Sequence, residues 1–188
     1  MRAGTRNLLG LPAVAVALLT ALLTTAPPAA AGPLIGGHWA KDGLARAQIY
    51  FVDHTGANWP VGGTVNEWNK ASGVDSYYVT SCPGSWLHCV NVWEWNDSGD
   101  NRYGVTFYNI GANGHFTSAE VWLNSGLARN ATQTRKTACH EEGHVLGLDH
   151  QFTRTSCLMS GDAVANGISV YPSADDLATL KSLYAHGN

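Results

Sequence analysis

Three histidines and one glutamate in the second half of the chain could form a metal site. His140 and His144 lie four residues apart, so on a helix their imidazoles project from the same side. Gly147 breaks the helix and lets the chain turn back, which can bring His150 to the same point. Three neutral imidazoles with an open fourth position are typical of a catalytic zinc site. Glu141, beside the first ligand, is placed to hold the zinc-bound water.

This segment resembles the zinc signature of the metzincin metalloproteases. Histidines at 140, 144 and 150, with a glycine at 147, have the spacing of that signature. Gly143 is typical of the matrixins within this group, and Met159, nine residues after His150, fits their methionine turn. The resemblance implies a matrixin-like zinc metalloprotease of the small secreted bacterial type, with one catalytic zinc ion as its cofactor.

The resemblance covers residues 44–185 in the order of its elements, and it implies a mechanism. A zinc-activated water would hydrolyse peptide bonds of extended protein substrates, with Glu141 as the general base. Phe116, Glu120 and Trp122 resemble the matrixin strand that borders the cleft. We expect this strand to lie at the edge of the sheet, where an extended peptide pairs with it through backbone hydrogen bonds.

Further metal sites have less support in the sequence. The structural zinc of matrixins needs several histidines and an aspartate around the strands, and only His115 matches such a position, so we do not predict that zinc. Asp97, Asp100 and Glu120 could bind calcium. Their spacing is not diagnostic of a calcium site, and they could instead be solvated turn residues, so both interpretations stay open.

Four cysteines in an exported chain favour disulfides, with three possible connectivities. Proximity along the chain favours Cys82–Cys89 and Cys139–Cys157. The second bond would enclose all three zinc ligands in one loop, which is worth on the order of 3 kcal/mol in the chain-entropy model. The alternative, a metal site from Cys82, His88 and Cys89, lacks a clear fourth ligand.

The first 31 residues have the features of a secretory signal peptide. Arg2 and Arg6 form a positive start, residues 8–23 are apolar, and residues 29–31 are three alanines that suit cleavage. The alternative, an uncleaved membrane anchor, is disfavoured because the apolar run is short and lies very early. We therefore expect a secreted, extracellular protein whose residues 32–188 form a single catalytic domain.

The site needs strands and helices to position it. Runs rich in β-branched and aromatic residues predict strands at 47–52, 76–80, 90–95, 104–110 and 120–123. A first helix is predicted after Pro60. A second begins after Asn130, whose side chain and Gln133 resemble a capping box, and it buries one stripe made of Ala131, Ala138 and Val145. Ser173 caps a last helix.

Strands that come first and main helices that come later predict an α+β fold. The resemblance to metzincins makes this fold more specific. It implies a zincin-like, twisted five-stranded mixed sheet with two long helices packed on it, a C-terminal helix, and a cleft that contains the catalytic zinc.

Composition limits the other functions. Only 13% of residues are charged and 45% are hydrophobic, which excludes a highly charged disordered chain and argues against a nucleic-acid binder. We expect a monomer that binds protein or peptide substrates and, after signal cleavage, no membrane. A rival function is a secreted peptide- or carbohydrate-binding module built on Trp93 and Trp95 beside Asp97. Tryptophan is also a common core residue, and these residues lack a sugar-binding spacing.

Overall fold

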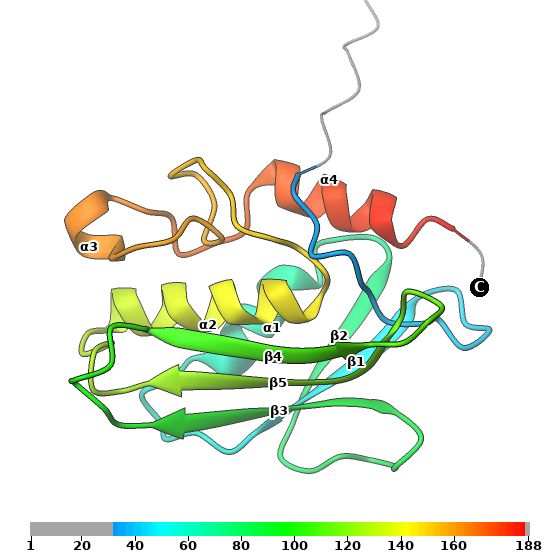
Figure 1. Ribbon diagram of the computed structural model, residues 1–188, viewed down its shortest axis with the longest axis horizontal. Coiled ribbons are helices and arrows are strands. Elements are labelled where there is room, and N and C mark those ends of the chain that lie inside the picture. Colours follow the sequence, from blue (N-terminus) through cyan, green and yellow to red (C-terminus); the bar gives the residue numbers. More distant parts are fainter. Residues whose placement is uncertain (1–31, 187–188) are drawn as a thin grey trace, which may run out of the picture.

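Five strands form one open, mixed sheet in the computed structural model, which describes residues 32–186; the predicted signal peptide, residues 1–31, lies outside them. The strand order is β2-β1-β3-β5-β4. Four strands run parallel, and β4 is antiparallel to β5 (Figure 1). The strands are β1 (Ala47–Asp53), β2 (Val74–Val79), β3 (His88–Trp95), β4 (Gly104–Ile110) and β5 (Phe116–Asn124).

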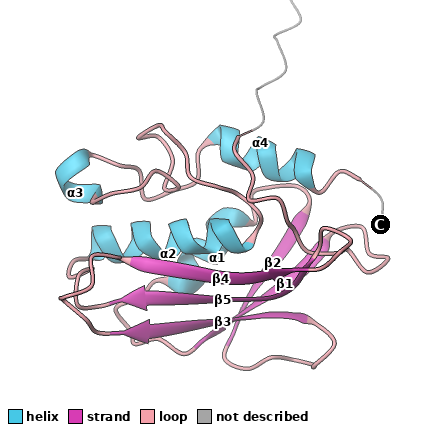
Figure 2. Cartoon of the chain, viewed as in Figure 1, coloured by secondary structure: helices cyan, strands magenta, loops and turns pink. Residues whose placement is uncertain are grey.

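Within residues 32–186, four helices accompany the sheet: α1 (Val61–Trp68), α2 (Ala131–Val145), α3 (Ala163–Asn166) and α4 (Ala174–Leu183). The long helix α2 contacts α1, β4 and β5. In Figures 1 and 2, α2 lies between the sheet and the C-terminal segment that carries α3 and α4. No helix within residues 32–186 is long and apolar enough to cross a membrane. The predicted α+β architecture is confirmed, although α1 is shorter than the long helix expected there.

The hydrophobic core lies between the sheet and the helices. Side chains alternate between the two faces of a strand, so every second residue points toward α1 and α2. The fully buried strand residues include Ile49, Phe51, Val90, Val92 and Val121. Residues at helical spacing on α1 complete this core, and they are Val61, Val65 and Trp68.

Helix α2 begins as predicted but is buried differently. The Asn130 side chain accepts a hydrogen bond from the Gln133 N–H at 2.9 Å, which confirms the N-cap. Ala131 is exposed, so the predicted apolar stripe is wrong at its first member. Residues 136–145 are all buried, including the polar ones. The reason is that the sheet covers one side of α2 and the C-terminal segment covers the other.

The position of β5 corrects the expectation of a substrate-binding edge strand. β5 pairs with β3 on one side and with β4 on the other, so β4 takes the edge of the sheet. Phe116 is buried in the core. Glu120 and Trp122 alternate with the buried residues of β5 and therefore belong to the face turned away from the helices. The prediction was wrong because β4, which precedes β5 in sequence, folds back antiparallel along its outer side.

Candidate metal centre

The three histidines of the signature come together. One ligand atom from each of His140, His144 and His150 lies within 4.8 Å of the other two. The ring centroids are 4.6 Å apart for the two helical histidines, and 5.0 and 4.8 Å from each of these to His150. The two helical histidines are buried, whereas His150 is exposed. The turn after α2 therefore returns the chain to the helix, as the spacing predicts.

Two glycines make this arrangement possible. Gly147 has a φ of +103°, in the left-handed region, and a β-carbon there would lie 2.6 Å from the carbonyl oxygen of Gly37. Gly143 lies where α2 approaches its neighbours most closely. A β-carbon at this position would lie 2.7 Å from both Leu158 and Trp68. The glycine that is typical of matrixins at this position is thus required by packing.

Backbone carbonyls orient two of the imidazoles. Nδ1 of His140 lies 2.9 Å from the carbonyl oxygen of Cys157, and Nδ1 of His144 lies 2.8 Å from that of Leu148. When each Nδ1 donates its proton to the carbonyl, Nε2 keeps a lone pair for a metal ion. Lys136 Nζ also lies 3.3 Å from Nδ1 of His140. An Nδ1 that donates to a carbonyl cannot accept from an ammonium group, so the shorter carbonyl contact sets the tautomer.

Burial keeps these two imidazoles neutral at pH 7. It lowers the pKa of His140 well below its usual range, and the nearby Lys136 ammonium acts in the same direction. Burial also lowers the pKa of His144 to about 4. Neutral imidazole is the form that binds metal ions, so both rings are ready to act as ligands.

Both disulfides that proximity favours are present. Cys139, which directly precedes His140, is bonded to Cys157, whose carbonyl orients the same histidine. This bond therefore joins the helix to the group that sets the direction of its first ligand. The other disulfide, Cys82–Cys89, joins the loop after β2 to the start of β3, and neither of its residues lines the cleft at the histidines.

The Glu141 carboxylate points from α2 toward the edge strand β4. Thr106 Oγ1 donates a hydrogen bond to its Oε2 at 2.9 Å. Gly104 leaves room for the same carboxylate, because a β-carbon there would lie 2.7 Å from Glu141 Cγ. Burial raises the pKa of Glu141 to about 7, against the opposing effects of the Thr106 hydrogen bond and of Lys136.

Thr106, Gly104 and Lys136 are site residues that we did not predict from the sequence. Residues 104 and 106 have the same parity on β4 and therefore share one face, but nothing in the sequence places that face against α2. Lys136 precedes His140 by four residues, a helical spacing that could have revealed it. Its side chain lines the cleft, and burial lowers its pKa to about 8.

The histidines and Glu141 open into a cleft of about 500 Å³. β4 forms one side of this cleft, α2 forms its floor, and Ser160 and Gly161 approach from the C-terminal segment. Met159 lies in the preceding turn, and its backbone pairs with Gln151, directly after His150. The predicted methionine turn therefore lies next to the third histidine.

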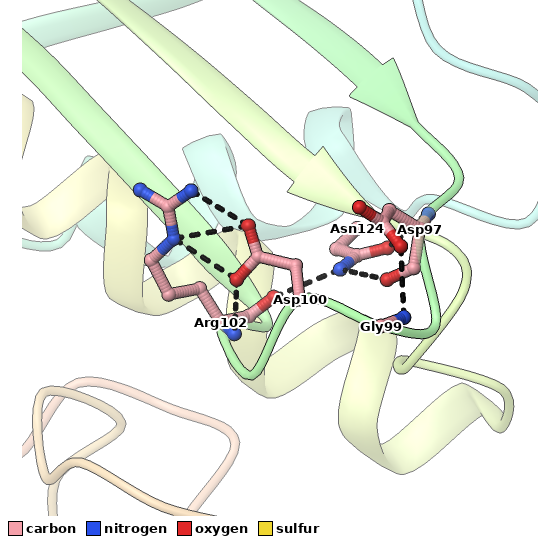
Figure 3. Close-up of polar contacts among 5 residues, drawn as sticks. All are labelled: Asp97, Gly99, Asp100, Arg102 and Asn124. Atoms are coloured by element: carbon pink, nitrogen blue, oxygen red, sulfur yellow. Dashed lines mark hydrogen bonds and ion pairs between the residues drawn. The ribbon is translucent and has the colours of Figure 1, made fainter.

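The loop between β3 and β4 borders the cleft, and the buried Asn124 holds it (Figure 3). Asn124 Nδ2 donates to the carbonyl oxygens of Asp97 and Arg102, at 2.8 and 3.0 Å. The Arg102 side chain pairs with Asp100 and lowers the pKa of that carboxyl to about 2. Asp97 Oδ1 accepts the Gly99 N–H at 2.8 Å. These carboxylates are engaged within the loop, and calcium binding stays a prediction.

Residues 96–185 match the model of the matrixin family, Peptidase M10. The matched segment contains all three clustered histidines, Glu141 and Met159. The predicted resemblance to a matrixin-like metzincin is therefore confirmed over this segment. The match supports a zinc metalloendopeptidase, and the prediction of an enzyme is confirmed.

The matrixin-like chain is also similar to solved structures of two other proteins. One is high choriolytic enzyme 1, a hatching enzyme zinc-protease from the medaka fish Oryzias latipes. The two chains are 13% identical, the match covers 79% of this chain and 94% of that chain, and the TM-score is 0.48. The other is myroilysin, with 14% identity, coverage of 83% and 99%, and a TM-score of 0.49. A search of curated protein sequences finds no match. The similarity to the matrixins therefore rests on residues 96–185 and on the histidine cluster.

Proposed function

We propose that this protein is a secreted zinc endopeptidase in which His140, His144 and His150 hold one zinc ion and Glu141 is the general base. One observation carries the proposal. Three imidazoles converge in the same cleft as a buried carboxylate, and that carboxylate is free of any ion pair among the described residues.

The donor set fits zinc. Imidazole nitrogens are common zinc ligands, and three of them leave a fourth position open, as in catalytic sites. The two carbonyl contacts that fix the helical histidines are the outer-shell partners that orient such ligands. When bound, zinc supplies Lewis-acid chemistry: it polarises the scissile carbonyl and lowers the pKa of a bound water toward neutrality.

Glu141 carries the proton transfers. Its carboxylate takes a proton from the attacking water and later delivers it to the nitrogen of the leaving amine. Thr106 already donates to Oε2, so Oε1 is the oxygen that is free for this transfer. Gly104 keeps the strand close to the carboxylate without a clash, since a β-carbon there would lie 2.7 Å from Oε1. The edge strand therefore positions the base.

The substrate binds along β4 in this proposal. β4 is the edge of the sheet, and Gly104, Val105, Thr106 and Tyr108 line the cleft. An extended peptide can add to such an edge through backbone hydrogen bonds, with its side chains directed alternately into and out of the cleft. The peptide then runs past the histidines and Glu141.

Export is part of the same proposal. The features of residues 1–31 are those of a secretory signal peptide. Two disulfides within the described residues suit an oxidising compartment outside the cytosol. We propose that residues 32–188 act as one catalytic domain after the signal has been removed.

Mapping of cleavage sites in a peptide library tests the proposed activity. The zinc-loaded protein should cleave internal peptide bonds, a chelator should abolish cleavage, and added zinc should restore it. Mass spectrometry of the products would also give the sequence preference. An intact library after incubation with fully zinc-loaded protein would overturn the proposal.

A further inference from the structure

A second group of three histidines lies outside the cleft. His38 belongs to the N-terminal segment, His115 to the turn between β4 and β5, and His186 to the chain after α4. One ligand atom from each lies within 4.8 Å of the other two, as in the catalytic cluster. These three segments lie at the same end of the molecule in Figure 1. We call this group the peripheral triad.

Main-chain contacts hold two members of the peripheral triad side by side. His38 and His115 form a parallel bridge, and the Phe116 N–H donates to the carbonyl oxygen of His38 at 2.8 Å. Their ring centroids are 4.7 Å apart. The His38 ring also packs edge-on against Tyr184, whose hydroxyl donates to the carbonyl oxygen of Leu146. These main-chain and ring contacts therefore hold the imidazoles of His38 and His115 in place.

The third imidazole approaches from the C-terminal end. Nε2 of His186 lies 2.8 Å from Nε2 of His38, although the two residues are 148 positions apart in sequence. At this distance the two nitrogens share one proton, and a bound metal ion would take the place of that proton between them. Within residues 32–186, none of the three rings forms an ion pair with a carboxylate. The triad is thus a set of convergent donor atoms without a competing charged partner.

The donor atoms limit which ions the peripheral triad can bind. A neutral imidazole is a ligand for zinc, copper and nickel, whereas calcium and magnesium prefer oxygen. The three imidazoles of the triad therefore favour a divalent transition-metal ion such as zinc.

We propose that His38, His115 and His186 bind a second divalent transition-metal ion such as zinc, separate from the catalytic ion. Three imidazoles supply three ligands, and the exposure of His186 leaves the fourth position to solvent. Only His115 has a counterpart in the matrixin pattern considered above, and the two other ligands come from opposite ends of the described chain.

The ion would fasten the N-terminal segment. That segment lies along the turn that follows α2: the Ile35 N–H donates to the Gly147 carbonyl oxygen at 3.2 Å, and the Asp149 N–H donates to the Pro33 carbonyl oxygen at 2.9 Å. This turn connects His144 to His150. A metal ion at the peripheral triad would tie the segment to the hairpin and to the chain end, and it would stabilise the folded state by mass action.

Metal analysis of an untagged protein tests the second site. The parent is Glu141→Ala, which cannot cleave itself in our proposal, equilibrated with Zn²⁺ and freed of excess by gel filtration. We expect two zinc ions per chain in the parent and one in His186→Asn and in His38→Asn. The matched control is His54→Asn, because His54 is an exposed histidine that stacks on Trp93 outside both clusters. It should keep two zinc ions.

Cobalt absorption gives a second readout. Titration of the metal-free parent with Co²⁺ should show two successive increases of ligand-field absorption, and His186→Asn should lose one of them. One zinc ion in the parent that is retained in His186→Asn would overturn the proposal, as would two zinc ions in His186→Asn or an equal loss in His54→Asn. In a further variant, His144→Asn is added to the parent to remove only the catalytic ion. This variant should still bind one zinc ion. The second site can thus be judged even if the proposed catalysis fails.

Discussion

The two histidine clusters within residues 32–186 are built in opposite ways. In the proposed catalytic cluster all three histidines lie between residues 140 and 150, on one helix and its C-terminal turn. Two of its rings donate to backbone carbonyls, and a disulfide fixes one of those carbonyls. In the peripheral triad His38 and His186 are 148 positions apart, and their rings contact each other.

This difference concerns preorganisation. Ligands whose direction is fixed before the ion arrives lose less entropy on binding, so the catalytic cluster should hold zinc more tightly than the peripheral triad. The peripheral triad instead joins distant segments of the chain. Its ion should matter more for stability than for the reaction.

The largest expected effect separates the clusters by activity. His144→Asn removes a catalytic ligand, and we expect peptide hydrolysis to fall by on the order of a thousandfold or more, because the Lewis acid is lost. His186→Asn removes a peripheral ligand and should keep most of the activity while the melting temperature in zinc falls by several degrees. Initial rates and thermal melts measure both. Comparable losses of activity in the two variants would remove the distinction.

The next effect compares the two disulfides. Replacement of both Cys139 and Cys157 by alanine should lower zinc affinity about 10- to 100-fold, since the carbonyl that orients His140 is no longer tied to α2. It should also cost on the order of 3 kcal/mol of stability. The control, alanine at both Cys82 and Cys89, should lose stability of a similar order with its zinc affinity unchanged. Competition with a zinc chelator would measure the affinities, and equal affinities in the two variants would contradict this role.

The smallest of these effects concerns the edge strand. Gly104→Ala places a β-carbon against the Glu141 side chain, and we expect kcat to fall about tenfold while zinc is retained, because the base is displaced. Gly63→Ala in α1 is the control, since a β-carbon there meets its nearest neighbour at 3.6 Å. It should leave kcat unchanged and gain up to about 1 kcal/mol of stability from helix propensity. Steady-state kinetics together with metal analysis measure both quantities. An unaltered kcat in Gly104→Ala would contradict the proposed clash with Glu141.

Local features of this protein could be predicted from its sequence. The spacing of the three catalytic histidines, the left-handed Gly147, the Asn130 cap and both disulfides depend on residues that are near each other in the chain. Short-range geometry restricts such features to few alternatives. The family resemblance then supplied the order of the remaining elements.

Features that depend on the packing of distant segments could not be predicted. Strand periodicity does not say that β4 lies outside β5, so the wrong strand was expected at the edge, and Thr106 and Gly104 were missed. Ala131 has the right helical phase but lies before the part of α2 that the C-terminal segment covers. The peripheral triad joins three segments that have no common periodicity, and only the folded chain brings them together.

Two neighbouring glutamates allow the most direct test of the central claim. Glu141 faces the cleft, whereas Glu142 is buried toward α1, where Thr64 Oγ1 donates to its Oε1 at 2.6 Å. Burial raises the pKa of Glu142 well above its usual range, so a glutamine resembles its neutral form.

The measurement is the rate of casein hydrolysis by zinc-loaded Glu141→Ala and Glu142→Gln, with zinc content determined for each. We expect both variants to keep catalytic zinc. Glu142→Gln should retain most of the activity, and Glu141→Ala should lose roughly 10²- to 10⁴-fold, the contribution typical of a general base. Undiminished hydrolysis by zinc-loaded Glu141→Ala would contradict the account.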